Sequence, residues 1–152
     1  VWHITRVFSR ENPFDKVEDD IILGRRLLAG ELPEGIVNCV DLTAEFEEVK
    51  EIRESTNYIS LPILDAAVPM PEDLAKALSQ IKEGATYVHC AQGHGRSGLF
   101  TLALLNTRDS VGSFEEGITI LKQARPGVRL NKVQESFARS FITEHTNATK
   151  PL

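Results

Sequence analysis

The chain has 152 residues, which is enough for one domain with a substantial core and too few for two ordinary domains. Its apolar share of 41% and charged share of 26% are typical of a soluble globular protein, and no apolar run approaches the roughly 18 residues of a membrane span. A net charge of −5 without a basic aromatic stripe argues against nucleic acid as a partner, and two cysteines indicate neither a disulfide framework nor a zinc site.

The N-terminal part of the sequence predicts short strands joined by polar turns. Residues 1–10 are rich in β-forming side chains and predict a first strand, whereas residues 12–20 combine Asn-Pro with an acidic run and predict a turn and a loop. Apolar runs with β-branched residues predict buried strands at 21–23 and 36–42.

A short helix is expected after residue 42. Thr43 suits its N-cap, and the acidic residues that follow would lie in the first turns, near the positive end of the helix dipole. These acidic residues are Glu45, Glu47 and Glu48. The segment 57–61 predicts the next strand, so this region is expected to form a βαβ unit.

Three prolines between positions 62 and 71 predict a loop at the carboxyl end of that strand. From Pro71 an amphipathic helix is expected to run to Glu83 and to stop at Gly84. Residues 85–89 predict a parallel strand that leads directly into a loop containing a cysteine.

The C-terminal part of the sequence predicts helices. The run 99–105 is apolar on every side and predicts a helix buried at the centre of the molecule. Ser113 begins a capping box for a helix at 114–124. Asn131 is expected to cap the last helix, whose inner face would carry Val133, Phe137 and Phe141.

Together these elements predict a single α/β domain over residues 1–144, followed by a polar, frayed tail at 145–152. The domain is expected to have a central, mostly parallel sheet with helices on both faces. Ligands of such sheets bind beyond the carboxyl ends of the strands. The loops that carry Asp65 and Cys90 both leave carboxyl ends, so topology brings these two residues to one edge.

The sequence His-Cys-Ala-Gln-Gly-His-Gly-Arg-Ser at 89–97 has the features of a phosphate-binding loop with a built-in nucleophile. Its backbone amides can surround a tetrahedral oxyanion, and the following helix N-terminus favours the thiolate of Cys90. Arg96 can clamp two phosphate oxygens, and Ser97 can donate its hydroxyl to the sulfur. The residues assigned to phosphate binding are Ala91, Gln92, Gly93, His94, Gly95 and Arg96.

Attack by a thiolate on a phosphate ester also requires a proton donor for the leaving oxygen. Asp65 is the leading candidate, because it lies in a non-helical loop at the correct edge and could later act as a base toward water. Glu72 and Asp73 compete for this role, although their place at a helix start already accounts for them.

Three further residues are expected to support the site. His89 is expected to hold the cysteine loop by a hydrogen bond rather than to transfer a proton. Asn131 and Gln134 are expected to cap the last helix, and Gln134 could also orient a water molecule.

The Cys-x5-Arg-Ser loop preceded by His, together with Leu-Pro-Ile-Leu-Asp-Ala-Ala-Val-Pro at 61–69, resembles the cysteine-dependent protein tyrosine phosphatase superfamily. Within it the chain is similar to the compact, microbial-type dual-specificity phosphatases over most of residues 20–142. The resemblance implies their fold and a mechanism without metal or cofactor. It also implies that Cys90 is the nucleophile, Arg96 the phosphate ligand, Asp65 the general acid and Ser97 the partner of the sulfur.

We therefore expect a phosphatase that acts on phosphotyrosine, and also on phosphoserine or phosphothreonine, through a phosphocysteine intermediate. A phosphoinositide or a small metabolite is the alternative substrate, although the loop lacks the lysines of lipid-phosphatase members. Two alternative functions come from other classes. One is a thiol-based arsenate reductase or sulfurtransferase, for which only Cys39 could be a second thiol. The other is a non-catalytic phosphate-binding module.

Several residues also have a plain structural interpretation. Cys39 is expected in a strand core. The alternative is a resolving thiol that protects Cys90 as a disulfide, which would require the two strands to be neighbours. His94 fits either a solvent-facing position or the pocket rim, and Arg125 and Arg129 are expected at the surface. No signal peptide is evident, so we expect a cytoplasmic monomer without a membrane span, whose partner is a phosphorylated protein or a small phosphoester.

Overall fold

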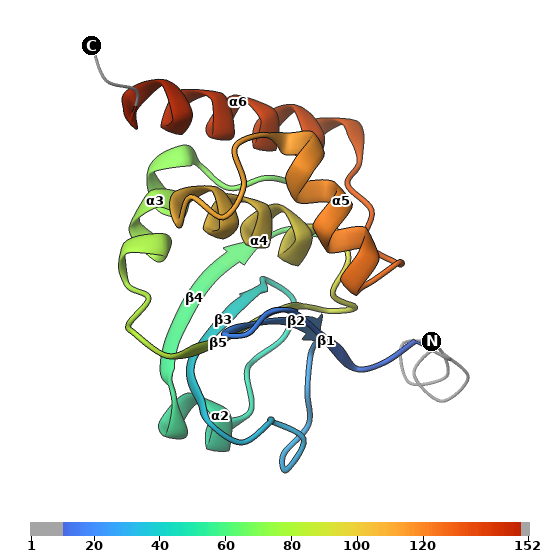
Figure 1. The fold of residues 1–152 in the computed structure, drawn as a ribbon. Helices are drawn as coiled ribbons and strands as arrows, with labels where there is room; N and C mark the ends of the chain where they lie inside the picture. Colours follow the sequence, from blue (N-terminus) through green and yellow to red (C-terminus); the bar gives the residue numbers. More distant parts are fainter. Residues whose placement is uncertain (1–10, 150–152) are drawn as a thin grey trace.

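The computed structural model describes residues 11–149, so the strand predicted at 1–10 lies outside the described part of the chain. A five-stranded sheet forms the centre, with its helices in two unequal layers (Figure 1). The elements in chain order are β1 (Phe14–Glu18), β2 (Ile21–Arg25), β3 (Ile36–Thr43), α2 (Lys50–Ser55), β4 (Asn57–Ile63), α3 (Pro71–Ser79), β5 (Ala85–Cys90), α4 (Arg96–Thr107), α5 (Phe114–Ala124) and α6 (Lys132–Thr149).

The strand order β1-β2-β5-β3-β4 places β5 at the centre of the sheet. β5 is parallel to both of its neighbours and β3 is parallel to β4, whereas β1 pairs antiparallel with β2. The predicted α/β class and mostly parallel sheet are therefore confirmed. Helices α3, α4, α5 and α6 cover one face, and α2 lies on the other (Figure 1).

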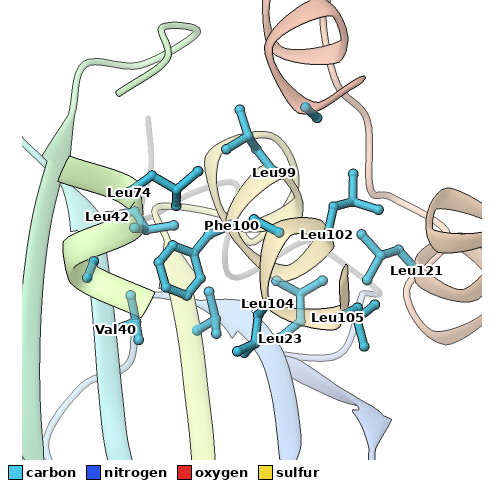
Figure 2. Close-up of a cluster of buried hydrophobic side chains, with 14 of the residues drawn as sticks. Leu23, Val40, Leu42, Leu74, Leu99, Phe100, Leu102, Leu104, Leu105 and Leu121 are labelled. Atoms are coloured by element: carbon cyan, nitrogen blue, oxygen red, sulfur yellow. The ribbon is translucent and has the colours of Figure 1, made fainter. Parts of the chain in front are cut away.

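The main core lies between the sheet and the larger helical layer, with α4 at its centre (Figure 2). Every residue of α4 from Arg96 to Asn106 is buried, which confirms the helix predicted to be apolar on every side. Its leucines meet α5, α6 and the inner face of the sheet. This packing fixes the start of α4 against the end of β5, where the cysteine loop lies. No helix within residues 11–149 is long and apolar enough to cross a bilayer.

The helix predicted from Thr43 is wrong, because residues 44–49 form an irregular loop and α2 begins only at Lys50. The side chain of Thr43 is not a helix cap. Its backbone N–H and its hydroxyl both donate to Asp41 Oδ1, at 2.9 and 2.7 Å, and this keeps Thr43 in β3. The acidic side chains of Glu45 and Glu48 are thereby free to reach the sheet edge.

Two strands extend beyond the prediction. β1 occupies part of the segment expected to be a turn and loop, and β4 continues through Pro62 to Ile63. β4 lies at the edge of the sheet, where a proline need not donate to a neighbouring strand. The predicted loop therefore begins at Leu64.

The ends of two helices also differ from prediction. α3 stops at Ser79 and not at Glu83, because the side-chain amide of Asn38 binds the backbone N–H and carbonyl of Lys82. α6 continues through Thr149, past the predicted start of the tail at 145. Val133 is 60% exposed, so it does not lie on the inner face of α6, whose buried residues are Gln134, Ala138 and Ile142.

Candidate active site

A cavity of 360 Å³ opens at the carboxyl ends of the strands and gathers the predicted site residues. Its lining residues are Asp65, Ala66, Cys90, Ala91, Gln92, His94, Gly95, Arg96, Arg129, Leu130, Asn131 and Gln134. His89 and Ser97 lie buried behind this wall, 2% and 0% exposed. The two loops that topology was expected to bring together therefore share one cavity.

Cys90 is the last residue of β5, and its side chain is 4% exposed. The N–H of Gly93 donates to Cys90 Sγ at 3.3 Å, and the hydroxyl of Ser97 lies 3.2 Å from the same sulfur. The first turn of α4 follows directly, so its N-terminal amides face the loop. This environment supplies hydrogen-bond donors to a thiolate.

The loop requires glycine at position 93. Gly93 has φ +81°, and a Cβ placed there would lie 2.4 Å from the backbone carbon of Gly24 in β2. The cysteine loop is therefore pressed directly against the neighbouring strand, and a side chain would separate the two backbones.

Arg125 is buried, 1% exposed, and the prediction that it lies at the surface is wrong. Its guanidinium donates to the carbonyls of Gly93 and Gln92, at 3.0 and 2.8 Å, on the outer side of the loop. It also forms ion pairs with Glu11 and Asp15 near the start of the described chain. Arg125 thus ties the cysteine loop to an otherwise distant segment.

His94 lies at the rim of the cavity, one of the two positions considered for it. Its Nε2 lies 2.8 Å from Glu11 Oε1, so the same carboxylate faces both His94 and Arg125. Arg129 is exposed and also lines the cavity, as a surface residue at its edge.

Arg96 is held by an acidic residue that sequence reasoning did not assign to the site. Its Nη1 and Nη2 donate to the two carboxylate oxygens of Glu45 at 2.7 and 2.8 Å, and Nη1 also donates to the carbonyl of Ile63 at 2.8 Å. A guanidinium has five N–H groups. Within residues 11–149, the remaining Nε–H and second Nη2–H of Arg96 form no hydrogen bond, and they make a fork suited to two phosphate oxygens.

The Glu45–Arg96 pair predicts a specific pH dependence of stability. The hydrogen bond from Arg96 lowers the pKa of Glu45 from 4.5 to about 2. The stabilising contribution of a lowered carboxyl pKa is complete above pH 4.5 and is lost as the pH falls toward 2. In urea unfolding, the difference between the native protein and Glu45→Gln should be constant from about pH 7 to 5 and shrink by about pH 3.

The matched control for this prediction is Glu51→Gln, which removes an exposed carboxylate of α2. Its effect on the free energy of unfolding should change much less over the same range. A Glu45→Gln difference that is the same at pH 7 and 3 would contradict the ion pair.

Asp65 projects into solvent, with its side chain 87% exposed, and its Oδ1 lies 3.7 Å from Arg96 Nη2. Asn131 and Gln134 hold the adjoining turn, by donating to the carbonyls of Ala66 at 2.9 Å and Ala67 at 3.3 Å. The same two residues exchange side-chain hydrogen bonds with each other's backbone N–H at the start of α6. Their predicted capping position is confirmed, and they also fix the Asp65 loop.

His89 has a second partner that the sequence analysis missed. Its Nδ1 lies 3.2 Å from the carbonyl of Cys90, and its Nε2 lies 2.5 Å from Glu48 Oε2. The same carboxylate oxygen lies 3.7 Å from Cys39 Sγ. The clue in the sequence was three acidic residues directly after a strand that ends at the ligand-binding edge.

The two cysteines lie on neighbouring strands, but register keeps them apart. Cys39 is paired with Tyr87, three residues before Cys90. At about 3.3 Å per residue this separates the two cysteines by roughly 10 Å along the strand, beyond the reach of a disulfide, which needs a Cα separation below about 7 Å. The two thiols also belong to different apolar clusters. A resolving role for Cys39 would therefore require a large movement of backbone.

A scan with protein-family models and a search of curated proteins gave no match. Solved structures do match. The crystal structure of PTPMT1 in complex with PI(5)P superposes with a TM-score of 0.81 at 19% identity, over 91% of this chain and 100% of that one. Tk-PTP in its active form gives a TM-score of 0.73 at 20% identity, over 91% and 98% of the two chains. Human DUSP28 gives a TM-score of 0.73 at 20% identity, over 90% of this chain and 95% of that one.

These comparisons confirm the predicted fold. The chain has the fold of the compact dual-specificity phosphatases, across nearly its whole length. At these identities the likeness is one of fold, so the chemistry has to be argued from the residues around the cavity.

Proposed function

We propose, from this fold and from the geometry of its cavity, that the protein is a cysteine-dependent phosphatase that hydrolyses phosphomonoesters through a phosphocysteine intermediate. The observation that carries the proposal is the set of groups around Cys90. Its sulfur accepts a hydrogen bond from the N–H of Gly93 and lies 3.2 Å from the hydroxyl of Ser97, at the end of a strand and the start of a helix, beside the open fork of Arg96. A purely binding site would not need a nucleophile at this point.

In the first step the Cys90 thiolate attacks phosphorus and forms an S–P bond while the bond to the leaving oxygen breaks. The loop amides and the fork of Arg96 hold the non-bridging oxygens, where negative charge is concentrated. Asp65 gives its proton to the leaving oxygen, so the alcohol or phenol departs neutral. Asp65 is exposed at the cavity mouth, where it can contact the leaving oxygen of a bound substrate.

In the second step water attacks phosphorus and the S–P bond breaks. The Asp65 carboxylate, left by the first step, accepts a proton from this water. The Ser97 hydroxyl, 3.2 Å from the sulfur, stabilises the departing thiolate. Gln134 lines the cavity and can orient the attacking water.

The role of Asp65 predicts a dependence on the leaving group. Asp65→Asn cannot donate a proton, so we expect kcat for phenyl phosphate, a poor leaving group, to fall by about 10²-fold. For p-nitrophenyl phosphate the leaving oxygen needs little protonation, and the loss should be several-fold smaller. Steady-state kinetics with both substrates measure the difference.

Asp73→Asn is the matched control, because this residue lies at the start of α3 and was the competing acid in the sequence. It should leave both rates within about two-fold of the native protein. Equal losses for the two substrates in Asp65→Asn would exclude general-acid catalysis by this residue.

A phosphoinositide is the second candidate substrate, and Arg129 is the observation that favours it. Arg129 lies on the cavity wall, and within residues 11–149 none of the ion pairs found involves it. Its guanidinium can meet a second anionic group or a glycerophosphate, as on an inositol head group. The solved structure of PTPMT1 with PI(5)P shows that this fold accommodates such a ligand in that protein.

A substrate panel separates the two candidates. Phosphotyrosine peptides, phosphoserine peptides and short-chain phosphoinositides are compared by phosphate release at equal concentrations, with Cys90→Ser as the blank. Preference for the peptides would support a protein phosphatase. A preference for the phosphoinositide that Arg129→Ala abolishes would support the second candidate.

A further inference from the structure

A second cavity adjoins the active site and lies between α5 and α6 (Figure 1). It has a volume of 360 Å³ and shares two lining residues, Arg129 and Leu130, with the cavity that contains Cys90. Both residues belong to the short segment that joins the two helices. The two cavities are therefore neighbours, and a ligand too large for the first can extend into the second.

The segment between the two cavities is held against the cysteine loop and the helix that follows it. A Cβ at Gly98, in the first turn of α4, would lie 3.3 Å from Leu130 Cδ1, so the leucine packs directly on this turn. A Cβ at Gly95, in the cysteine loop, would lie 3.5 Å from the carbonyl oxygen of Arg129. The second cavity is thus fixed in place relative to the phosphate-binding loop.

Part of the lining of the second cavity is apolar. Phe114 and Ile118 lie one turn apart on α5, and Leu130 contributes from the joining segment. Phe114 is buried, whereas Ile118 and Leu130 are half-buried and pack on the main core with their inner sides. This lining can remove an apolar side chain of a ligand from water.

Two basic residues of the lining have no partner in the part of the chain that the structure describes. Lys122, in the last turn of α5, and Arg129 are exposed, and neither side chain forms an ion pair or a hydrogen bond with a described residue. The acidic residues of the lining, Glu115 and Glu135, are both bound to Arg139. The positive charge that is left for a ligand therefore lies with Lys122 and Arg129.

The dimensions of the second cavity fit a few residues of extended polypeptide. Phe114 and Lys122 are eight residues apart on α5, which corresponds to about 12 Å along the helix. An extended chain covers this distance in about four residues. A phosphorylated protein can therefore place its phosphate at Cys90, a carboxylate near Lys122 and Arg129, and an apolar side chain on the apolar lining.

A phosphoinositide fits the second cavity less well. Its phosphates all lie on or beside one small ring, so a second phosphate can reach Arg129 at the shared wall but leaves the apolar lining empty. Its acyl chains would also hold the protein against an anionic membrane. The exposed carboxylates of Glu115 and Glu135, and the net charge of −5, oppose such an approach.

We propose that the cavity between α5 and α6 is a docking site for the polypeptide of a phosphorylated protein substrate. It selects an acidic residue and an apolar residue within about four residues of the phosphorylated one. The carboxylate is attracted by Lys122 and Arg129, and the apolar side chain packs on the lining that α5 and Leu130 provide. This assignment rests on the proposed phosphatase function and adds a class of substrate to it.

The experiment compares Lys122→Glu with the native protein on phosphotyrosine peptides. Each peptide carries a glutamate or a lysine, together with a leucine, within about four residues of the phosphotyrosine. One series has these residues on the amino side and the other on the carboxyl side, which covers both directions of the bound chain.

In one series, kcat/KM of the native protein should be about tenfold higher for the glutamate peptide than for the lysine peptide, because attraction replaces repulsion. Replacement of the leucine by serine should lower kcat/KM several-fold. In Lys122→Glu the preference for the glutamate peptide should vanish or reverse.

Lys76→Glu is the matched control, because Lys76 is the exposed basic residue in the last turn of α3, as Lys122 is in α5. Lys76 lines neither of the two cavities. This variant should keep the native preference between the peptides. Because both lysines are exposed, both variants should fold, which circular dichroism checks.

A native protein that does not distinguish the glutamate and lysine peptides in either series would overturn the proposal. A preference that Lys122→Glu leaves unchanged would also overturn it, and so would a loss in this variant of phosphoinositide hydrolysis but not of peptide hydrolysis. In each of these cases release of phosphate from p-nitrophenyl phosphate would still support the phosphatase function.

Binding of the same peptides to Cys90→Ser, followed by fluorescence anisotropy, tests the docking site without turnover. The glutamate peptide should bind about tenfold more tightly than the lysine peptide, and addition of Lys122→Glu should remove the difference. This result, together with no phosphate release from any substrate by the native protein, would reject the phosphatase function while the docking site stood.

Discussion

Replacement of Cys90 by serine is expected to abolish hydrolysis of p-nitrophenyl phosphate, with a fall in kcat of roughly 10⁴-fold or more. A serine hydroxyl does not ionise near neutral pH, and within residues 11–149 no histidine or carboxylate forms a hydrogen bond with Sγ that could activate a hydroxyl at this position. The groups that the described residues place against this atom are the N–H of Gly93 and the hydroxyl of Ser97, which can stabilise a thiolate. Loss of the thiolate therefore removes the attacking species altogether.

The same chemical change at the other cysteine is the control. Cys39→Ser alters a fully buried thiol on the opposite side of the sheet, and the folded variant should keep its turnover within about two-fold. The Cys90 variant should still bind inorganic phosphate or vanadate, because the loop amides and Arg96 remain. Full activity in Cys90→Ser would refute the phosphocysteine mechanism.

Replacement of Arg96 by lysine is expected to reduce kcat/KM for the same substrate by about 10³-fold. A lysine keeps the positive charge, but it cannot bind Glu45 through two nitrogens and still present a planar fork to the phosphate. The side chain is 3% exposed, so solvent cannot replace the missing donors. Steady-state kinetics and equilibrium binding of vanadate together measure the loss.

Arg139→Lys is the matched control, because Arg139 lies on the exposed surface of α6 and pairs with Glu115 and Glu135. Its kinetic constants should be those of the native protein. A loss in Arg96→Lys no larger than in this control would show that the fork does not bind the transferred phosphoryl group.

Elements encoded by local rules were predicted correctly from the sequence. The hydroxyl of Ser113 accepts the N–H of Glu116, as its capping motif predicts, and the run 99–105 lies in a helix buried on every side. The cysteine loop was also predictable, because its glycines, cysteine and arginine are close in sequence. Asp65 and Cys90 were brought to one edge by the general topology of parallel sheets.

The errors arose where a distant partner outweighed a local preference. Glu45 and Glu48 suit the first turn of a helix, but each finds a hydrogen-bond partner in or beside the cysteine loop, Arg96 for Glu45 and His89 for Glu48, and the chain stays irregular to reach it. From its local sequence alone, an arginine such as Arg125 is expected to be exposed to solvent. It is buried because carbonyls of the cysteine loop and carboxylates near residue 11 surround it, and neither is near it in sequence.

Arg125 has a consequence for the order in which the protein can become active. Its ion pair with Glu11 joins residues 114 positions apart, so residues 11–125 must all be synthesised, and their ends brought together, before this contact can close. A fragment that ended before α5, or began after β1, would retain the cysteine but lack one side of this brace. The fragment that began after β1 would carry a buried, unpaired charge, at a cost of about 3–5 kcal/mol. The fragment that ended before α5 would have a loosened cysteine loop. Under the proposed function, activity is therefore expected to appear late in folding, and partly built chains are expected to release no phosphate.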